Sequence, residues 1–474
     1  MTLQSLSNLD GILTPIEVEI SLLPGLPNIQ VVGLPDAAIK ESAIKVKAAI
    51  RSQGFEFPKA RTVIINLRPS NIRKSSQGLE LAMVLGILMQ TNQIKFPCEL
   101  HEKKCLIYGE INLHGEVFCP EDIRGFGEFE NESSILVTGE NSYVLGVDQY
   151  QIKTLAQIAN GQVYKGQEFK FTTQRPNLSG TKFTKEQARL MSIVAAGEHP
   201  LLLVGPSGTG KSTFIHQIPS LLRPPSSVAT KEIYKLWKGK IPPWRPVVSP
   251  HHSATMLAMV GGGVPPKIGE VSRAHGGTLL MDEFLEYRSE VFEALREPIE
   301  TGKIVIARGS FEKVFPAKFL LLATSNLCKC GNYVPKRSNK CICTNRDKQL
   351  YFSRFNGPML DRVSVIAFTD GWDKMGDIGL ERILDNVNAA IKFSQKTRSQ
   401  ELPNHNVEFS DLKIDEKIGI LETSSRRRLK LFKQVLRTIA DLEGCKTPKS
   451  YHFEEASQLC LKSHQRITTQ LALY

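Results

Sequence analysis

A glycine-rich segment in the middle of the 474-residue chain has the residue types that bind phosphate groups. Glycines let backbone N–H groups turn toward an anion, and a following helix adds its positive N-terminus. The pattern G-x-x-x-x-G-K-[ST] also places a lysine ammonium on the β- and γ-phosphates and a hydroxyl on magnesium. Its members are Gly205, Pro206, Ser207, Gly208, Thr209, Gly210, Lys211 and Ser212, directly after the apolar run 201–204. The segment predicts a site for ATP and Mg²⁺, with Ser212 as a magnesium ligand.

Two adjacent acids follow a second apolar run, residues 278–281, at the end of a predicted strand. Asp282 should hold Mg²⁺, and Glu283 should orient or deprotonate the water that attacks the γ-phosphate. A third apolar run, residues 319–323, leads to Asn326, whose amide could hydrogen-bond the same water. Together with the phosphate loop, these side chains predict ATP hydrolysis.

Arginines further along the chain could stabilise the charge of the transferred phosphoryl group. Arg362 cannot easily reach the site on its own chain, so it is a candidate arginine finger for a neighbouring subunit. The triplet Arg426, Arg427 and Arg428 begins the last long helical stretch, and one of its guanidinium groups could return to the γ-phosphate. A solvated basic cluster is the alternative interpretation of the triplet.

Four cysteines form two C-x-C pairs separated by ten residues: Cys328, Cys330, Cys341 and Cys343. A loop that folds back would offer four thiolates to one zinc ion, and free cytosolic thiols are the alternative. Basic residues surround the pairs, so a metal-bound loop could contact DNA phosphates. They are Lys329, Lys336, Arg337, Lys340, Arg346 and Lys348.

The elements that must position these residues follow from hydrophobic patterning. The runs 200–204, 278–281 and 319–323, separated by helical stretches, predict a parallel sheet buried on both faces. The first 165 residues predict an α/β domain, with strands at 18–22, 29–32, 62–67 and 134–137 and helices at 36–53 and 79–89. Residues 161–181 predict a connector. The last hundred residues predict helices, with Leu429, Phe432, Leu436 and Ile439 on one stripe and Gly444 as a stop.

Composition narrows the class of protein. Sixty Lys and Arg against 48 Asp and Glu give a formal charge of +12, which favours polyanions such as DNA or RNA as partners, although a solvated basic surface is equally compatible. Nine cysteines, four of them in one segment, argue against a secreted disulfide framework. No run of eighteen uncharged apolar residues is present, and the N-terminal residues lack a secretory profile. We therefore expect a cytoplasmic protein that is not in the membrane.

Several motifs go beyond this general logic and resemble known families. The segments 250–253 (PHHS), 261–263 (GGG), 269–275 (GEVSRAH) and 294–300 (ALREPIE) are similar to the magnesium-chelatase-like AAA+ group. In the amino-terminal half, residues 31–38 (VVGLPDAA) and 52–58 (SQGFEFP) resemble the ComM family, also called YifB. The resemblance covers most of the chain.

The resemblance implies a Lon-protease-like α/β domain at 1–165, an AAA+ P-loop ATPase core at 180–375 with a Cys-rich insertion at 328–343, and a C-terminal helical lid at 376–474. It also implies a homo-hexameric ring that acts as a DNA helicase. Such a translocase would use ATP to drive branch migration of single-stranded and branched DNA at recombinase–DNA joints during natural transformation. The resemblance assigns Asn326 as sensor 1, Arg362 as the arginine finger and Arg427 as the best match to sensor 2, with Arg426 and Arg428 as alternatives.

A β-hairpin with a Gly309–Ser310 turn is predicted at residues 303–314. In ring ATPases of the kind that this chain resembles, such a hairpin lines the pore, and residues 260–273 would form a second pore element. Lys303, Arg308 and Lys313 are then candidates for contacts to the DNA backbone, with exposed surface charge as the alternative.

The sequence also departs from the family pattern. Residues 182–187 read KFTKEQ in place of a lysine-glycine-glutamine signature, and residues 324–327 read TSNL in place of methionine-asparagine-proline. A Lon-type protease uses a serine activated by a lysine. When the segment Lys74-Ser75-Ser76 and the helix after it are aligned, the nucleophile position falls at Gly78, so we expect no peptidase activity.

The sequence is compatible with three functions. We favour a ComM-like DNA translocase. A magnesium-chelatase-type motor subunit would share the central motifs, and an AAA+ remodelling ATPase could act on protein instead.

Overall fold

The computed structural model describes residues 1–9, 12–69, 77–95, 104–120, 123, 134–140, 148–159, 163–166, 173–178, 180–237, 242–263, 266–308, 311–333, 341–355, 357–369, 372, 376–410, 412 and 425–472. The chain divides into two compact units. The first comprises Met1–Phe171 with Ile233–Ile241, and the second comprises Thr172–Glu232 with Pro242–Tyr474. Each unit has its own hydrophobic core.

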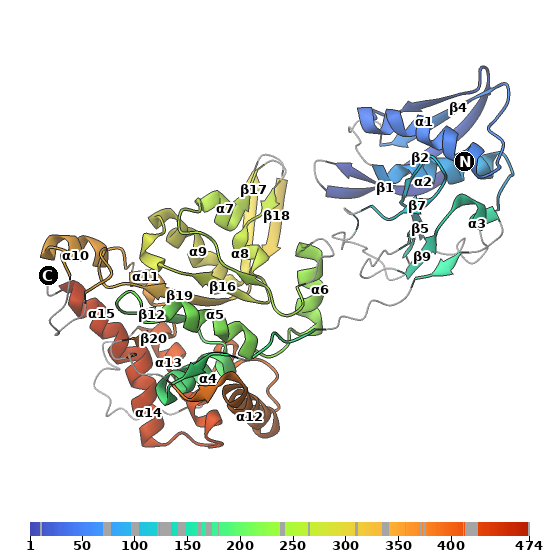
Figure 1. Cartoon of the computed structure of the whole chain (residues 1–474). Coiled ribbons are helices and arrows are strands. Elements are labelled where there is room, and N and C mark those ends of the chain that lie inside the picture. The colour runs from blue at the N-terminus through green and yellow to red at the C-terminus, as the bar shows by residue number, and fades with distance from the viewer. Residues whose placement is uncertain are drawn as a thin grey trace. The chain divides into compact units, whose positions relative to one another are not determined.

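The first unit is built on a mixed sheet with the strand order β10-β9-β8-β5-β1-β2-β4-β3 (Figure 1). Its strands are β1 (Thr2–Leu9), β2 (Ile12–Pro24), β3 (Asn28–Val32), β4 (Arg61–Arg68), β5 (Lys104–Ile107), β8 (Ser134–Gly139), β9 (Asp148–Ile152) and β10 (Tyr164–Lys165), beside the separate pair β6 (Glu110–Ile111) and β7 (Val117–Phe118). In β4, Val63, Ile65 and Leu67 are buried and alternate with more exposed residues, so one face of the strand packs on the core.

Two helices cover this core. Helix α1 (Ala37–Ser52) begins where the Asp36 side chain accepts a hydrogen bond from the Ile39 N–H. Helix α2 (Glu80–Gln90) has nine successive buried residues and contacts α1, β1 and β2, so it lies inside the unit. The short helices are η1 (Gln77–Leu79) and α3 (Leu155–Ala159). The four predicted strands and both predicted helices are confirmed, although β2 begins six residues before the predicted strand at 18–22.

Gly78, the residue expected at the Lon nucleophile position, lies just before α2. A Cβ atom there would lie 2.3 Å from a ring carbon of Tyr108, which is fully buried. The position therefore has no room for a side chain unless that ring moves. Residues 74–76 lie outside the described part of the chain, and both the likeness to Lon protease and the lack of peptidase activity stay predictions.

The second unit contains a five-stranded sheet in which every neighbouring pair is parallel. The order is β13 (Val247–Val248), β16 (Thr278–Met281), β19 (Leu320–Ser325), β12 (Leu201–Val204) and β20 (Val365–Phe368). All residues of β12, β16 and β19 are buried, which confirms the predicted sheet covered on both faces. Because the strands are parallel, their carboxyl ends meet at one edge of the sheet.

Helices and short hairpins surround this sheet (Figure 1). The helices before residue 376 that lie wholly in this unit are α4 (Lys185–Gly197), α5 (Lys211–Leu221), α7 (Met256–Val260), α8 (Glu270–Arg273), η4 (Phe284–Glu286), α9 (Ser289–Thr301), α10 (Asn345–Phe352) and α11 (Gly357–Leu360). Helix α6 (Ser227–Leu236) crosses the division of the chain, because its residues from Ile233 onward belong to the first unit. The antiparallel pairs are β11 (Lys182–Phe183) with β21 (Ile378–Gly379), β14 (Gly261–Gly262) with β15 (Lys267–Ile268), and β17 (Lys303–Arg308) with β18 (Phe311–Pro316).

The C-terminal part is helical, as predicted. It consists of α12 (Leu380–Arg398), η5 (Asn404–Asn406), α13 (Arg426–Leu442), α14 (Ser450–Ser457), η6 (Gln458–Lys462) and α15 (Ser463–Ala472). The stripe on α13 packs inward, with Phe432, Leu436 and Ile439 fully buried against α4, α12 and α14. Gly444 follows the helix with a left-handed φ of 64°, which confirms it as the stop. These helices lie in the same compact unit as the sheet, and the lid and the three-domain division stay predictions.

A buried ion cluster fastens α12 to α13. Asp441 accepts hydrogen bonds from Arg398, Arg437 and Asn404, and only 3% of Asp441 is exposed.

Among the described residues, no helix combines the length and the apolar character needed to cross a membrane.

The packing of α13 predicts a large stability loss on truncation. Phe432→Ala should lower the free energy of unfolding by about 3–5 kcal/mol, because it leaves a cavity where α13 meets α4, α12 and α14. Leu350→Ala, at a position 61% exposed on α10, is the control and should change it by about 0.5 kcal/mol or less. Urea denaturation followed by circular dichroism measures both, and equal effects would contradict the described packing.

Candidate functional site

The predicted phosphate loop connects β12 to α5 at the carboxyl edge of the parallel sheet. Gly208 and Gly210 have φ angles of 77° and 80°, a left-handed conformation that residues with a Cβ rarely adopt. Helix α5 begins at Lys211, directly after Gly210. Successive amides in such a loop, followed by a helix N-terminus, form a concavity that suits an anion.

Lys211 is the cation of this loop and is held by three oxygen atoms. Its Nζ donates to the carbonyls of Gly205 at 2.9 Å and Pro206 at 2.6 Å, and to Oδ1 of Asn326 at 3.2 Å. Burial lowers the pKa of Lys211, while the nearby carboxylates of Asp282 and Glu283 raise it. The structure thus brings the predicted lysine and the predicted sensor amide into direct contact.

The two acids follow β16, next to the end of β19. The hydroxyl of Thr324 donates to Oδ1 of Asp282 and accepts a hydrogen bond of 3.1 Å from the N–H of Glu283. Glu283 has a left-handed φ of 51°, and about half of its side chain is exposed. Thr324 therefore bonds both to the side chain of Asp282 and to the backbone of Glu283. The sequence placed Thr324 after the third apolar run, but a threonine at the end of a strand does not by itself indicate contact with the acids.

His252 was also missed as a site residue. Its Nδ1 lies 3.7 Å from Oε2 of Glu283, and its ring lies against that of His251, with ring centroids 4.1 Å apart. His252 belongs to the PHHS motif after β13, so the parallel sheet brings this motif to the same edge as the acids. The sequence signalled it only through the resemblance.

A pocket of about 390 Å³ opens beside the phosphate loop. Its lining residues are Gly180, Thr181, Lys182, Phe183, Gln187, Thr209, Gly210, Thr213, Phe214 and Gly376. Phe183 and Phe214 meet edge to face, with ring centroids 6.2 Å apart. A pocket with two aromatic rings and several polar groups next to an anion-binding loop is suited to a nucleoside. It includes part of the segment that departs from the family signature.

Two of the predicted arginines lie together around one carboxylate of α9. Arg362 and Arg427 both donate to Oε1 of Glu300, and Arg362 also donates to the carbonyl of Pro358 at 2.6 Å. Arg428 is buried instead and donates to three backbone carbonyls, those of Leu360, Val363 and Cys460. Arg428 therefore ties the start of α13 to its neighbours, whereas the side chain of Arg427 is 44% exposed.

The basic candidates of the hairpin do not share one face. β17 and β18 pair so that Lys303 lies opposite Pro316, and Lys313 lies opposite Ile306. Residues opposite each other in an antiparallel pair point to the same face, and side chains alternate along a strand. Lys303 thus lies on the exposed face, and Lys313 lies on the face of Ile306. Arg308 pairs with Phe311, and the turn residues 309–310 lie outside the described part of the chain.

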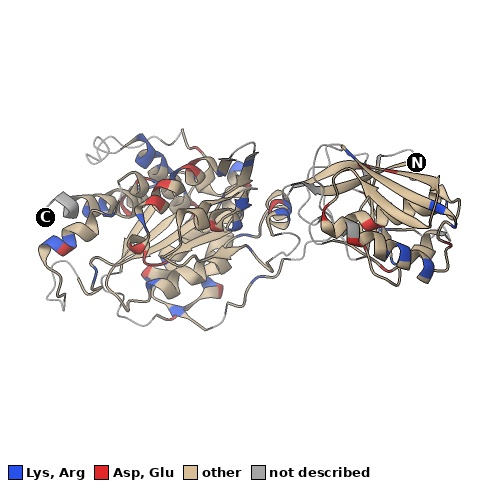
Figure 2. Cartoon of the chain, turned by 90° about the horizontal axis from the view of Figure 1, so that it is seen from above, with Lys and Arg blue, Asp and Glu red and all other residues tan. Residues whose placement is uncertain are grey.

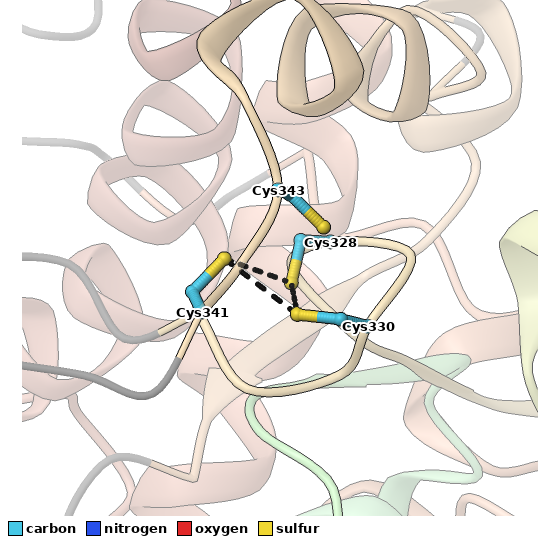
Figure 3. A group of neighbouring side chains, drawn as sticks. All are labelled: Cys328, Cys330, Cys341 and Cys343. Atoms are coloured by element: carbon cyan, nitrogen blue, oxygen red, sulfur yellow. Dashed lines mark hydrogen bonds between the residues drawn. The ribbon is translucent and has the colours of Figure 1, made fainter.

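The four cysteines of the two C-x-C pairs come together, and their sulfur atoms point toward one another (Figure 3). All four Sγ atoms lie within 4.8 Å of one another. Of the basic residues around them, Lys329 and Arg346 are exposed, and Lys348 lies over the ring of Tyr333 at 4.5 Å. Lys336, Arg337 and Lys340 lie outside the described residues.

Comparison with known proteins gives the relatives of the chain. The family "Magnesium chelatase, subunit ChlI" matches residues 177–374, and "Subunit ChlI of Mg-chelatase" matches residues 16–124. The uncharacterized protein YifB of Escherichia coli is 33% identical over 73% of this chain and 71% of its own. YifB of Salmonella typhimurium is 29% identical over 93% of each chain, and the competence protein ComM of Haemophilus influenzae is 29% identical over 94% of each.

These matches, the parallel sheet and the phosphate loop define a magnesium-chelatase-like AAA+ protein. Membership of this class suggests ATPase activity with ATP and Mg²⁺. Within that class, the chain belongs to the ComM/YifB family.

The contact of Thr324 with both acids predicts a role in turnover. Thr324→Val keeps the shape of the side chain but removes the hydroxyl, so ATP hydrolysis should fall about 10- to 100-fold, with a smaller change in ATP affinity. Thr324→Ser keeps the hydroxyl and should retain most of the activity. Steady-state phosphate release and binding of a fluorescent ATP analogue measure the two effects. If the Val variant is as active as the Ser variant, the hydroxyl of Thr324 has no role in turnover.

Proposed function

We propose that this protein is an ATPase that moves DNA and promotes branch migration when incoming DNA recombines during natural transformation. The observation that carries the ATPase part is the convergence of the phosphate loop, two carboxylates and the amide of Asn326 at one edge of the sheet. Phosphoryl transfer requires little more from a protein than this positioning and charge stabilisation.

Each residue of the site has a role in this proposal. The backbone from Gly205 to Ser212 and the ammonium of Lys211 bind the phosphates, and the pocket beside Phe183 receives the nucleoside. Ser212 and Asp282 ligate Mg²⁺, and Glu283 orients or deprotonates the attacking water. Asn326 lies within 3.2 Å of Lys211 and is suited to sense the γ-phosphate. His252 beside Glu283 holds that carboxylate until the nucleotide arrives.

DNA as the substrate is supported by relatives and by charge. The family includes a protein named for competence, ComM of Haemophilus influenzae, which is similar to this chain over nearly its whole length. The chain carries a formal charge of +12, and its basic residues are spread over both units among acidic ones (Figure 2). Lys303, Arg308 and Lys313 remain our candidates for contacts to the strand backbone. A protein with this task would work in the cytoplasm.

Assembly into a homo-hexameric ring is part of the same proposal. The guanidinium groups of Arg362 and Arg427 gather on Glu300, where a second subunit could draw one of them to its own γ-phosphate. Burial lowers the pKa of Arg362, and the carboxylate of Glu300 raises it. Arg362 is the finger in this arrangement, and Arg427 acts as sensor 2.

A second candidate function is a motor subunit for metal insertion. The match of residues 177–374 to the magnesium-chelatase family favours it. A remodelling ATPase that acts on protein would use the same nucleotide site. Neither alternative calls for a response to DNA.

Stimulation by DNA separates these functions. ATP hydrolysis by the full chain should rise when single-stranded or forked DNA is added, and DNA affinity should fall steeply with salt, because phosphate contacts release counterions. Lys211→Ala should bind no nucleotide, and Glu283→Gln should bind ATP without turnover. If DNA does not change the rate of ATP hydrolysis at any salt concentration, the translocase hypothesis is wrong, and the metal-insertion motor becomes the favoured function.

A shared active site predicts complementation between two inactive variants. Arg362→Ala and Glu283→Gln should each lose about 1,000-fold or more in turnover, because each lacks one part of the transition-state machinery. In mixed rings, the Glu283→Gln subunit offers its intact Arg362 to the intact site of the other subunit, so activity should partly return. Mixing Arg362→Ala with the double variant is the control and should restore nothing. Recovery in that control, or none in the first mixture, would contradict the trans finger.

A further inference from the structure

The four-cysteine cluster has the geometry of a site for a single metal ion. The Sγ atoms of Cys328 and Cys330 are 3.3 Å apart, and Sγ of Cys341 lies 3.6 Å from Cys330 and 3.7 Å from Cys328. Four sulfurs around a tetrahedral zinc, each at about 2.3 Å, would be separated by about 3.8 Å. The spacing therefore needs only a small expansion to fit zinc, and Cys343 completes the set within 4.8 Å (Figure 3).

The closeness of the sulfurs also suits a cation. Four thiolates within 4.8 Å of one another repel one another unless a positive ion compensates their charge. A zinc ion would supply that charge.

The loop that carries the first two cysteines is bonded to the phosphate loop. The N–H of Ser207 donates to the carbonyl of Gly331 at 2.8 Å, and Gly331 follows Cys330 directly. A Cβ at Gly331 would lie only 1.9 Å from Oγ of Ser207, and φ of Gly331 is 78°. A side chain at position 331 would therefore strain the backbone and displace the side chain of Ser207.

The same cysteine loop continues from the sensor amide. Asn326 precedes Cys328 by two residues, and both Cys328 and the intervening Leu327 are fully buried. The N–H of Gly331 donates to the carbonyl of Cys328 at 3.0 Å, which closes the turn. One short turn thus joins the cluster to Asn326 on one side and to Ser207 on the other, and Asn326 in turn contacts Lys211.

We propose that one zinc ion on Cys328, Cys330, Cys341 and Cys343 works as a clasp that holds the phosphate loop and Asn326 in their binding geometry. Metal occupancy then sets the affinity of the protein for nucleotide. The nucleotide part of this inference rests on the proposed ATP site, whereas the clasp itself is a property of the cysteine turn and the phosphate loop.

Zinc removal tests the clasp without nucleotide or DNA. The full chain should contain one zinc per chain by elemental analysis after purification without added metal. Chelation under reducing conditions, or Cys341→Ser, should remove the ion and speed amide hydrogen exchange in the peptide 205–212, because Ser207 loses a fixed partner. Binding of a fluorescent ATP analogue should weaken about tenfold, the scale of one hydrogen bond to an anion-binding loop.

Gly331→Ala separates the clasp from the metal itself. Its Cβ would displace the side chain of Ser207 and disturb the contact of the two loops, while all four cysteines remain. Zinc should therefore be retained, whereas exchange in 205–212 rises and nucleotide affinity falls. Gly54→Ala is the matched control. Gly54 has φ of 79°, like Gly331, but a Cβ there meets nothing within 4 Å. This control carries the same backbone strain and should change neither zinc content, exchange in 205–212 nor nucleotide affinity.

Three results would overturn the inference. One is purified protein without zinc that also takes up none when zinc is added. Another is loss of zinc with unchanged exchange in 205–212. The third is Gly331→Ala behaving like Gly54→Ala. A protein that fails to bind ATP but shows the exchange effect would instead reject the proposed ATPase and keep the clasp.

Discussion

The structure depends above all on bringing opposite charges together at one edge of a buried parallel sheet. A triphosphate with magnesium needs amides, a cation and carboxylates within a few ångströms, and these groups come from segments far apart in the chain. Because β12, β16 and β19 are parallel and wholly buried, their carboxyl ends have no freedom to separate. The ammonium of Lys211, whose pKa burial lowers, is stabilised there by carbonyls, by Asn326 and by the two acids.

The surroundings of this edge act by restricting its parts. Thr324, at the end of β19, bonds to both acids, which follow the neighbouring strand β16. The carbonyl of Gly331 bonds to the phosphate loop at Ser207. Arg362 and Arg427 are gathered by a carboxylate of α9, so their charges are kept in position by a partner that can be exchanged. The proposed ring ATPase would need this combination, because groups that contact the phosphates would stay fixed while groups at a subunit boundary would change partners.

Much of the fold could be predicted because its signals are local. Asp36 caps α1, Gly444 ends the turn after α13, and three apolar runs mark the central strands. The strand order of the first sheet could not be predicted. β1 pairs with β2 in antiparallel and with β5 in parallel orientation, about a hundred residues away, and such pairing depends on the whole core. The hairpin was predicted, but only its register separates Lys303 from Lys313 by face.

The sequence by itself determined the chemistry of the site, because a phosphate loop, a pair of acids after a strand and two C-x-C pairs need particular residue types at fixed spacing. Only the tertiary structure decided which of these groups touch. The contact of Thr324 with Asp282, the approach of His252 to Glu283 and the bond between Gly331 and Ser207 join residues that are between 31 and 124 positions apart. Spacing along the chain carries no information about such contacts, since they exist only once the strands have paired and the loops between them are packed.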